Sequence, residues 1–156
     1  MKYSGMTLSK KTFIYGAIFS LANRLQVLGD RIDPFVSTKQ WFVLAVIAKF
    51  DKGKPNIGDI AKILGTSRQN VKKMAVILEK KGYIKLQKNK DDLRNIQLIL
   101  TDKCYEYFKS REQLENEYAE TIFRDMDEKV IDSLCDGINK IINNIDQLVE
   151  DNRYKG

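Results

Sequence analysis

Histidine is absent from this 156-residue sequence, and only two cysteines, Cys104 and Cys135, occur. Without histidine, the usual general base and the triads built on it are excluded, as is any zinc site with a histidine ligand. Two cysteines do not suggest a disulfide framework. The nine glycines are scattered, so no glycine-rich phosphate loop is present. We therefore expect a protein that is not an enzyme and that carries no metal and no cofactor.

Long apolar runs are also missing. None approaches the roughly 20 residues that a membrane-spanning helix needs. Lysines precede an apolar stretch near the N-terminus, but Ile14–Leu21 is short and interrupted, and no small-residue cleavage site follows it. These features predict a soluble, cytoplasmic protein without a membrane partner.

Charge is plentiful but unevenly placed, at 31% of the residues with a net charge of +6. From Lys62 to Lys90, nine basic residues stand against one acid, Glu79. From Arg111 to Glu150, eleven acids stand against four bases. The middle of the chain therefore favours a polyanionic partner, although a basic run on an ordinary helical domain also occurs as a solvated face.

Gly58 to Thr101 has the pattern of a helix, a tight turn, a second helix and a two-stranded hairpin. Gly65 ends the first helix, because glycine adopts the left-handed backbone at low cost. Thr66 and Gln69 have the spacing of a capping box that opens the second helix, and Gly82 stops it. The apolar positions repeat with the helical period and then alternate along the hairpin: Val71, Met74, Ala75 and Leu78 on the helix, and Ile84, Leu86, Ile96, Leu98 and Leu100 on the strands.

Early exposed positions of the second helix carry long donors and amides, which can read base edges in a major groove. We expect base reading from Arg68, Gln69, Asn70 and Lys73, and phosphate contacts from Thr66, Ser67 and Lys72. The hairpin tip is a charged wing, in which Lys88, Lys90 and Arg94 are expected to contact a flanking minor groove or its backbone. Asp92 is expected to brace Arg94 or the wing turn, because phosphates repel a carboxylate.

Leu64–Ile84 and Asp91–Thr101 resemble the multiple-antibiotic-resistance regulator (MarR) family of winged helix-turn-helix repressors. The likeness rests on the run from Leu78 through Gly82 to Ile84, and on Asp92-Leu93-Arg94 followed by a strand that ends in Leu100-Thr101. It implies a mainly α fold with a small β-hairpin in a single chain, residues 1–156. Residues 35–101 would form the winged helix-turn-helix, and residues 8–30 and 102–150 would form dimerisation helices. The implied function is sequence-specific binding of double-stranded DNA by a transcriptional regulator, most often a repressor.

Apolar stripes at both ends of the chain support an assembly of two copies. They are expected on helices over Leu8–Asp30, Lys103–Phe123 and, after a break at Asp125–Asp127, on a last helix whose stripe is too wide to face water. Trp41–Phe50 is apolar on almost every side and is expected to be the central core helix. The simplest arrangement is a two-fold homodimer that reads a pseudo-palindromic operator. A three-helix bundle within one chain remains the alternative.

Regulation has two candidate routes. In the resembling family, small aromatic or phenolic compounds bind between the dimerisation helices and the winged helix. Six aromatic residues fit such an effector cleft, although each also fits an ordinary core: Tyr15, Phe19, Trp41, Phe42, Tyr107 and Phe108. Alternatively, Cys104 lies in the first turn of a helix, whose dipole can lower a thiol pKa. Peroxide-sensing relatives carry their reactive cysteine near the N-terminus, where this sequence has none, so both cysteines are better read as buried small hydrophobes.

Two other functions fit the same fold. One is a ligand-independent architectural DNA-binding protein, and the other is a winged helix that binds protein or RNA. Arg68, Asn70, Lys72 and Lys73 at early exposed helix positions favour DNA over the second of these.

Overall fold

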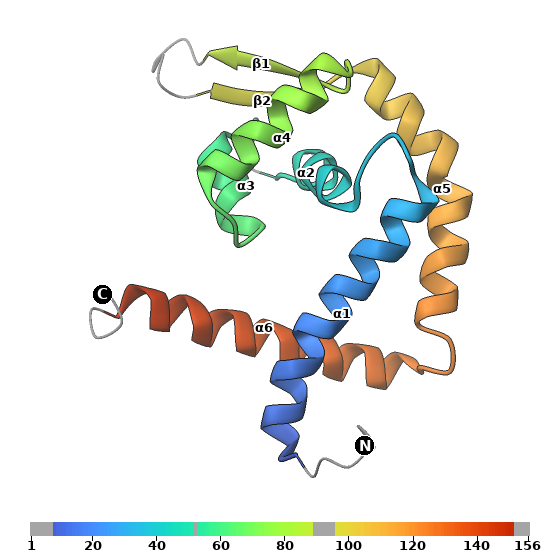
Figure 1. The fold of residues 1–156 in the computed structure, drawn as a ribbon, viewed down its shortest axis with the longest axis vertical. Coiled ribbons are helices and arrows are strands. Elements are labelled where there is room, and N and C mark those ends of the chain that lie inside the picture. Colours follow the sequence, from blue (N-terminus) through green and yellow to red (C-terminus); the bar gives the residue numbers. More distant parts are fainter. Residues whose placement is uncertain (1–7, 52, 89–95, 152–156) are drawn as a thin grey trace. The chain divides into compact units, whose positions relative to one another are not determined.

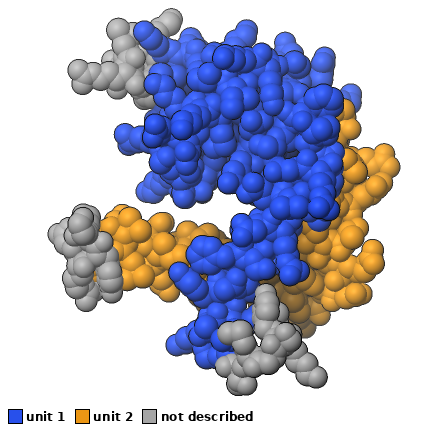
Figure 2. Space-filling model, viewed as in Figure 1, with its two compact units in different colours: residues 1–109 blue, residues 110–156 orange. Residues whose placement is uncertain are grey.

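A computed structural model of the chain describes residues 8–51, 53–88 and 96–151. It is mainly α-helical with one antiparallel β-hairpin, which confirms the predicted fold class (Figure 1). The elements in chain order are α1 (Lys10–Ile32), α2 (Thr38–Ala48), α3 (Ile57–Ile63), α4 (Arg68–Lys80), β1 (Ile84–Lys88), β2 (Ile96–Leu100), α5 (Asp102–Ile122) and α6 (Glu128–Glu150). Internal contacts divide the chain into two compact units, residues 1–109 and 110–156 (Figure 2).

The core of the first unit lies among α2, α3, α4 and the hairpin. Helix α4 buries its predicted stripe through Val71, Ala75 and Leu78, and β2 contributes Leu98. Fully burying such a side chain stabilises the fold by about 1.5–3 kcal/mol. The buried hydrophobic residues are Val36, Val43, Leu44, Ile47, Ile60, Ala61, Val71, Ala75, Leu78, Ile84, Leu98 and Cys104.

Glycine ends both helices of the helix-turn-helix, as predicted. Gly65 has φ +60° and Gly82 has φ +80°, both in the left-handed region. At the end of α3, Gly65 N donates to Lys62 O and Thr66 N donates to Ala61 O. These two bonds form a Schellman motif, which satisfies the last carbonyl groups of the helix.

The prediction that Thr66 caps α4 was wrong. Ser67 is the N-cap, and its Oγ accepts from Asn70 N at 3.2 Å, so the helix begins at Arg68. The backbone of Thr66 is already used to close α3, and the cap therefore falls one residue later. Elsewhere, Ser37 with Gln40 and Asn56 with Asp59 form capping boxes at the starts of α2 and α3.

Helix α2 is less enclosed than its sequence suggested. Val43, Leu44 and Ile47 are buried, but Phe42 is 50% exposed and Trp41 is half-buried. The expectation of burial on nearly every side was therefore wrong for the described chain, because α1, α4 and the hairpin cover only part of the helix.

Helix α1 meets α2 at a close approach. Thr38 N donates to Asp30 Oδ1 at 2.7 Å, and Thr38 Oγ1 donates to Gln26 O at 3.1 Å. The hydrogen bond from the Thr38 backbone is the main reason that the pKa of Asp30 is lowered. A Cβ on Gly29 would lie 2.4 Å from Thr38 Oγ1, so only glycine fits there without a shift.

A buried carboxylate, Asp33, forms hydrogen bonds at the end of α1, next to its contact with α2. Its Oδ1 accepts from Phe35 N at 2.7 Å and Val36 N at 2.9 Å, and its Oδ2 accepts from the Tyr107 hydroxyl at 2.7 Å. Three hydrogen bonds offset the cost of removing the carboxylate from water. They connect the end of α1 to the first turns of α5 within the first unit.

The second unit comprises the later part of α5 and all of α6. The predicted break between these helices is confirmed, since Asp125 has φ +64° and Asp127 caps α6 by accepting from Val130 N at 2.9 Å. No residue of α6 is buried. Its apolar stripe is exposed at Val130, Leu134, Ile138, Ile142, Ile145, Leu148 and Val149.

Candidate nucleic-acid interface

Helix α4 separates a buried face from a polar one. Val71, Ala75 and Leu78 anchor it in the core, and the residues predicted to read DNA lie on the opposite side. Arg68, Gln69, Asn70, Lys72 and Lys73 are all exposed. The fold therefore presents one continuous surface of amides and cations over the first turns of α4.

Hydrogen bonds order the start of this surface. Asn70 Nδ2 donates to Thr66 Oγ1 at 3.2 Å, while Ser67 Oγ accepts from Asn70 N. A hydroxyl that accepts a bond retains its own proton, so Thr66 and Ser67 can still donate to a phosphate. Arg68 lies beside the start of α3, because a Cβ on Gly58 would be only 3.4 Å from Arg68 Nε.

The hairpin adds further cations. Lys85 and Lys88 are exposed on β1, and Lys88 pairs with Ile96 at the last described position before the tip. Lys90, Asp92 and Arg94, which were also predicted to form the wing site, lie outside the described residues.

Lys81 of the basic region and Lys103 of α5 bind protein groups instead. Lys81 Nζ donates to Phe35 O and, at 3.2 Å, to Gln40 Oε1, which ties the end of α4 to the start of α2. Lys103 Nζ donates to Lys81 O at 2.6 Å and lies 5.0 Å from the centre of the Tyr83 ring. Both contacts place a positive charge at the C-terminal end of α4, where the helix dipole favours it.

Comparison with known proteins shows which family has a similar winged helix. Residues 36–94 match the model of the MarR family. The winged helix-turn-helix part of this chain is therefore similar to that of the MarR family, whose regulators are transcription factors. No curated protein matches the sequence at a significant level.

Solved structures of MarR-family regulators share the fold over nearly the whole chain. A MarR/EmrR family transcriptional regulator from Acinetobacter sp. ADP1 is 21% identical, with a TM-score of 0.77 over 90% of this chain and 99% of that one. MepR of S. aureus in complex with DNA is 15% identical, with a TM-score of 0.69 over 89% and 99%. The organohalide-sensing regulator RdhR, in its 2,4-dichlorophenol-bound form, is 16% identical, with a TM-score of 0.74 over 92% and 88%.

The aromatic residues predicted to line an effector cleft occur in pairs. Ring centroids are 5.3 Å apart for Tyr15 and Phe19, 5.4 Å for Trp41 and Phe42, and 5.9 Å for Tyr107 and Phe108. Trp41, Tyr107 and Phe108 pack against the core, whereas Tyr15 is 69% exposed on α1. An effector cleft lined by these six residues stays a prediction.

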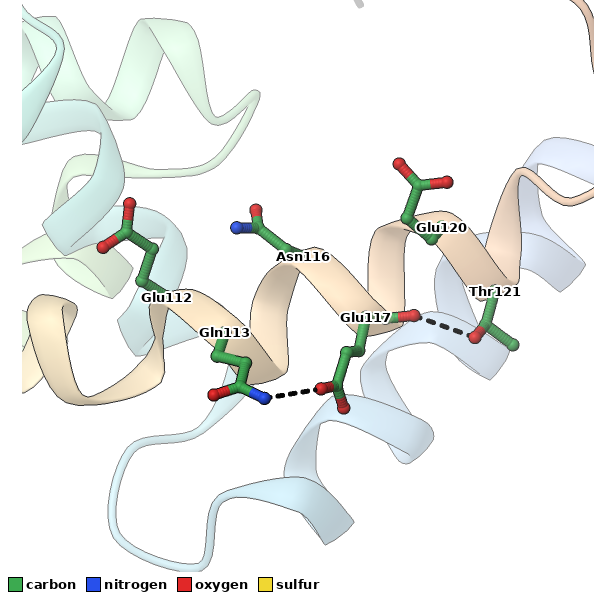
Figure 3. Close-up of a pocket in the computed structure, with 6 residues that line it drawn as sticks. All are labelled: Glu112, Gln113, Asn116, Glu117, Glu120 and Thr121. Carbon is green, nitrogen blue, oxygen red and sulfur yellow. Dashed lines mark hydrogen bonds between the residues drawn. The ribbon is translucent and has the colours of Figure 1, made fainter.

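A shallow depression of the surface lies elsewhere, on α5. Figure 3 shows Glu112, Asn116 and Glu120 along one side of the helix, with Gln113, Glu117 and Thr121 along another. Gln113 Nε2 donates to Glu117 Oε1 at 3.0 Å, and Thr121 Oγ1 donates to Glu117 O at 2.8 Å. Three carboxylates give this surface a negative charge, so it is unsuited to a nucleic acid.

The cysteines differ from each other. Cys104 is buried as predicted, and burial raises its pKa to about 11. Desolvation therefore exceeds any lowering by the helix dipole, which argues against the alternative of a reactive thiolate at Cys104. Cys135 is exposed on α6, so the prediction that it is buried was wrong.

Within residues 8–51, 53–88 and 96–151, no group of three or more cysteine, aspartate or glutamate side chains is placed to hold a metal ion. In the same ranges, no helix combines the length and apolar character required to cross a bilayer.

Proposed function

We propose that this chain is a cytoplasmic transcriptional regulator, without enzymatic activity, that binds a pseudo-palindromic operator as a homodimer and acts as a repressor. The observation that supports the proposal most directly is the exposed polar face of α4. Arg68, Gln69, Asn70 and Lys73 would read base edges in the major groove, and Thr66, Ser67 and Lys72 would hold phosphates. Lys88, with Lys90 and Arg94, would contact DNA from the wing, and Asp92 would brace it.

The apolar stripes of the terminal helices support the homodimer. Ile14, Ile18, Leu21, Leu25 and Leu28 are exposed on α1, and α6 exposes a longer stripe. Contiguous apolar surface of this kind marks an interface. A two-fold pair built from residues 8–30 and 102–150 would present two winged helices, residues 35–101, to half-sites one turn of DNA apart.

Release by a small aromatic or phenolic effector is the regulatory part of the proposal. The similarity to RdhR in its dichlorophenol-bound form supports it, as do the paired aromatic rings of α1, α2 and α5. A compound that binds one spacing of the two recognition helices better than another would shift the operator affinity.

The test is fluorescence anisotropy with the duplex from upstream of the gene and a scrambled duplex, over a salt series. We expect tighter binding to the native duplex, with an affinity that falls as salt rises. Arg68→Ala should weaken native-duplex binding by about 1–3 kcal/mol and reduce the preference over scrambled duplex. Arg124→Ala, which removes an exposed arginine from the second unit, is the matched control and should bind as wild type.

Equal binding to both duplexes would contradict sequence-specific regulation and favour an architectural role. Absence of binding at low salt would contradict DNA binding altogether and leave the basic region as a solvated face.

A further inference from the structure

One rung of the hairpin is held from both edges. Leu86 of β1 and Leu98 of β2 are paired, and Leu98 N donates outward to Pro55 O at 2.9 Å. In an antiparallel ladder, alternate pairs point both N–H groups away from each other. Leu86 N therefore points to the opposite edge, where it donates to Glu79 Oε1 at 2.8 Å. The loop before α3 and the end of α4 thus hold the same rung.

This rung is closer to the wing tip than the hydrogen bonds at the base of the hairpin. At the base, Thr101 N donates to Tyr83 O at 3.1 Å, and Thr101 Oγ1 donates to Gly82 O at 2.7 Å. Those bonds fix where the strands leave α4 and enter α5. The Glu79 bond instead lies two residues before Lys88 on β1, so it holds the strand close to that lysine.

The charge of Glu79 makes its position informative. It is the only acid from Lys62 to Lys90, in a region whose other charges attract phosphates. From electrostatics alone, this carboxylate weakens DNA binding, and its removal should strengthen it. A contact that orders the wing has the opposite effect, because a wing fixed before binding loses less conformational entropy on binding.

We propose that Glu79 is a positioning residue for the wing. Its carboxylate joins β1 to α4, so that Lys85 and Lys88 are held at a fixed place relative to the base-reading face of α4. The inference rests on the proposed DNA-binding function and adds to it a residue that touches no DNA.

The experiment compares Glu79→Ala with Glu79→Gln in full-length protein, using the anisotropy assay above. Glutamine retains the acceptor oxygen and removes the charge, whereas alanine removes both. We expect Glu79→Ala to bind native duplex about 5–10-fold more weakly than wild type, although it removes a negative charge. We expect Glu79→Gln to bind within about twofold of wild type.

A double-mutant cycle with Lys88→Ala tests whether Glu79 acts through the wing. Lys88→Ala should weaken binding in the wild type and reduce the salt slope by about 0.9. In the Glu79→Ala background, the same substitution should have a smaller effect, since the wing no longer holds Lys88 in place. Additive effects would contradict positioning, and tighter binding by Glu79→Ala would overturn the proposal.

Amide exchange at Leu86, followed by NMR without DNA, separates this inference from the proposed function. Glu79→Ala should accelerate exchange at Leu86, and Glu79→Gln should not. If the wild type bound no duplex, DNA binding would fail as a function, yet faster exchange in Glu79→Ala would still support the tether. Unchanged exchange would overturn it.

Discussion

The winged helix and the terminal helices use apolar residues in opposite ways. All the buried hydrophobic residues of the described chain lie between Val36 and Cys104. Helices α1 and α6 contain no buried residue, although α6 has the most regular apolar stripe of the sequence. A regular stripe therefore shows which face of a helix avoids water, but it does not show which surface covers that face.

The difference has a thermodynamic consequence. The winged helix covers its own core, so its folding is expected to depend little on protein concentration. If a second copy covers the terminal helices, their stability is linked to association and rises with concentration. Three measurements test this contrast, starting with the largest expected effect.

Ile138→Asp should separate the proposed dimer. Ile138 lies in the middle of the α6 stripe and is 46% exposed in the single chain. In a two-fold dimer the charge is buried twice, at about 2 kcal/mol or more each, which weakens association by about 1,000-fold. Sedimentation velocity over a dilution series measures the change.

Asn143→Asp is the matched control, because it adds the same charge on the other side of α6 and should leave the dimer intact. A dimer that survived Ile138→Asp, or one lost equally in both variants, would remove α6 from the interface.

Leu78→Ala should affect the winged helix alone. Leu78 is fully buried between α4 and the rest of the core, and such a truncation costs about 2–5 kcal/mol. Urea unfolding, monitored by the fluorescence of Trp41, should have its midpoint at a lower urea concentration than in the wild type. The size of this shift should be the same at every protein concentration. Leu134→Ala, the same change on the exposed stripe of α6, should instead alter only a concentration-dependent transition. A concentration-dependent shift in Leu78→Ala would break the contrast.

Thiol reactivity gives the smallest effect. The folded protein should react with a neutral-pH thiol reagent at Cys135 and not at Cys104, which burial keeps protonated. Because the pKa of Cys104 rises from 9.0 to about 11 on folding, its contribution to stability is complete below pH 9 and declines as pH rises toward 11. Peptide mapping after labelling identifies the modified residue, and modification of Cys104 at neutral pH would contradict the packed core.

Much of the winged helix could be predicted from local sequence. Gly65 and Gly82 end helices because of their backbone freedom, and Val71, Ala75 and Leu78 bury because their spacing matches the helical period. These features depend on neighbours within a few residues. The exposed polar residues of α4 follow from the same periodicity.

Other features depend on contacts between distant parts of the chain. From the sequence alone, Glu79 is one negative charge without a predictable partner. Its partner is the backbone N–H of Leu86, whose direction is set by the strand register. Lys81 likewise counts as a free cation until α2 supplies Gln40 as its acceptor. The cap at Ser67 replaced Thr66 because the end of α3 uses the Thr66 backbone.

The close approach of Gly29 and Thr38 also constrains how this sequence can drift over evolutionary time. The two positions share one small volume, since a methyl group on residue 29 would overlap the Thr38 hydroxyl. A lineage that acquired alanine at 29 would be under selection to change residue 38 as well. A smaller residue there would vacate that space but give up the bond from Thr38 Oγ1 to Gln26 O. Variation at residues 29 and 38 should therefore be correlated, so that sequences with a side chain at 29 lack threonine at 38.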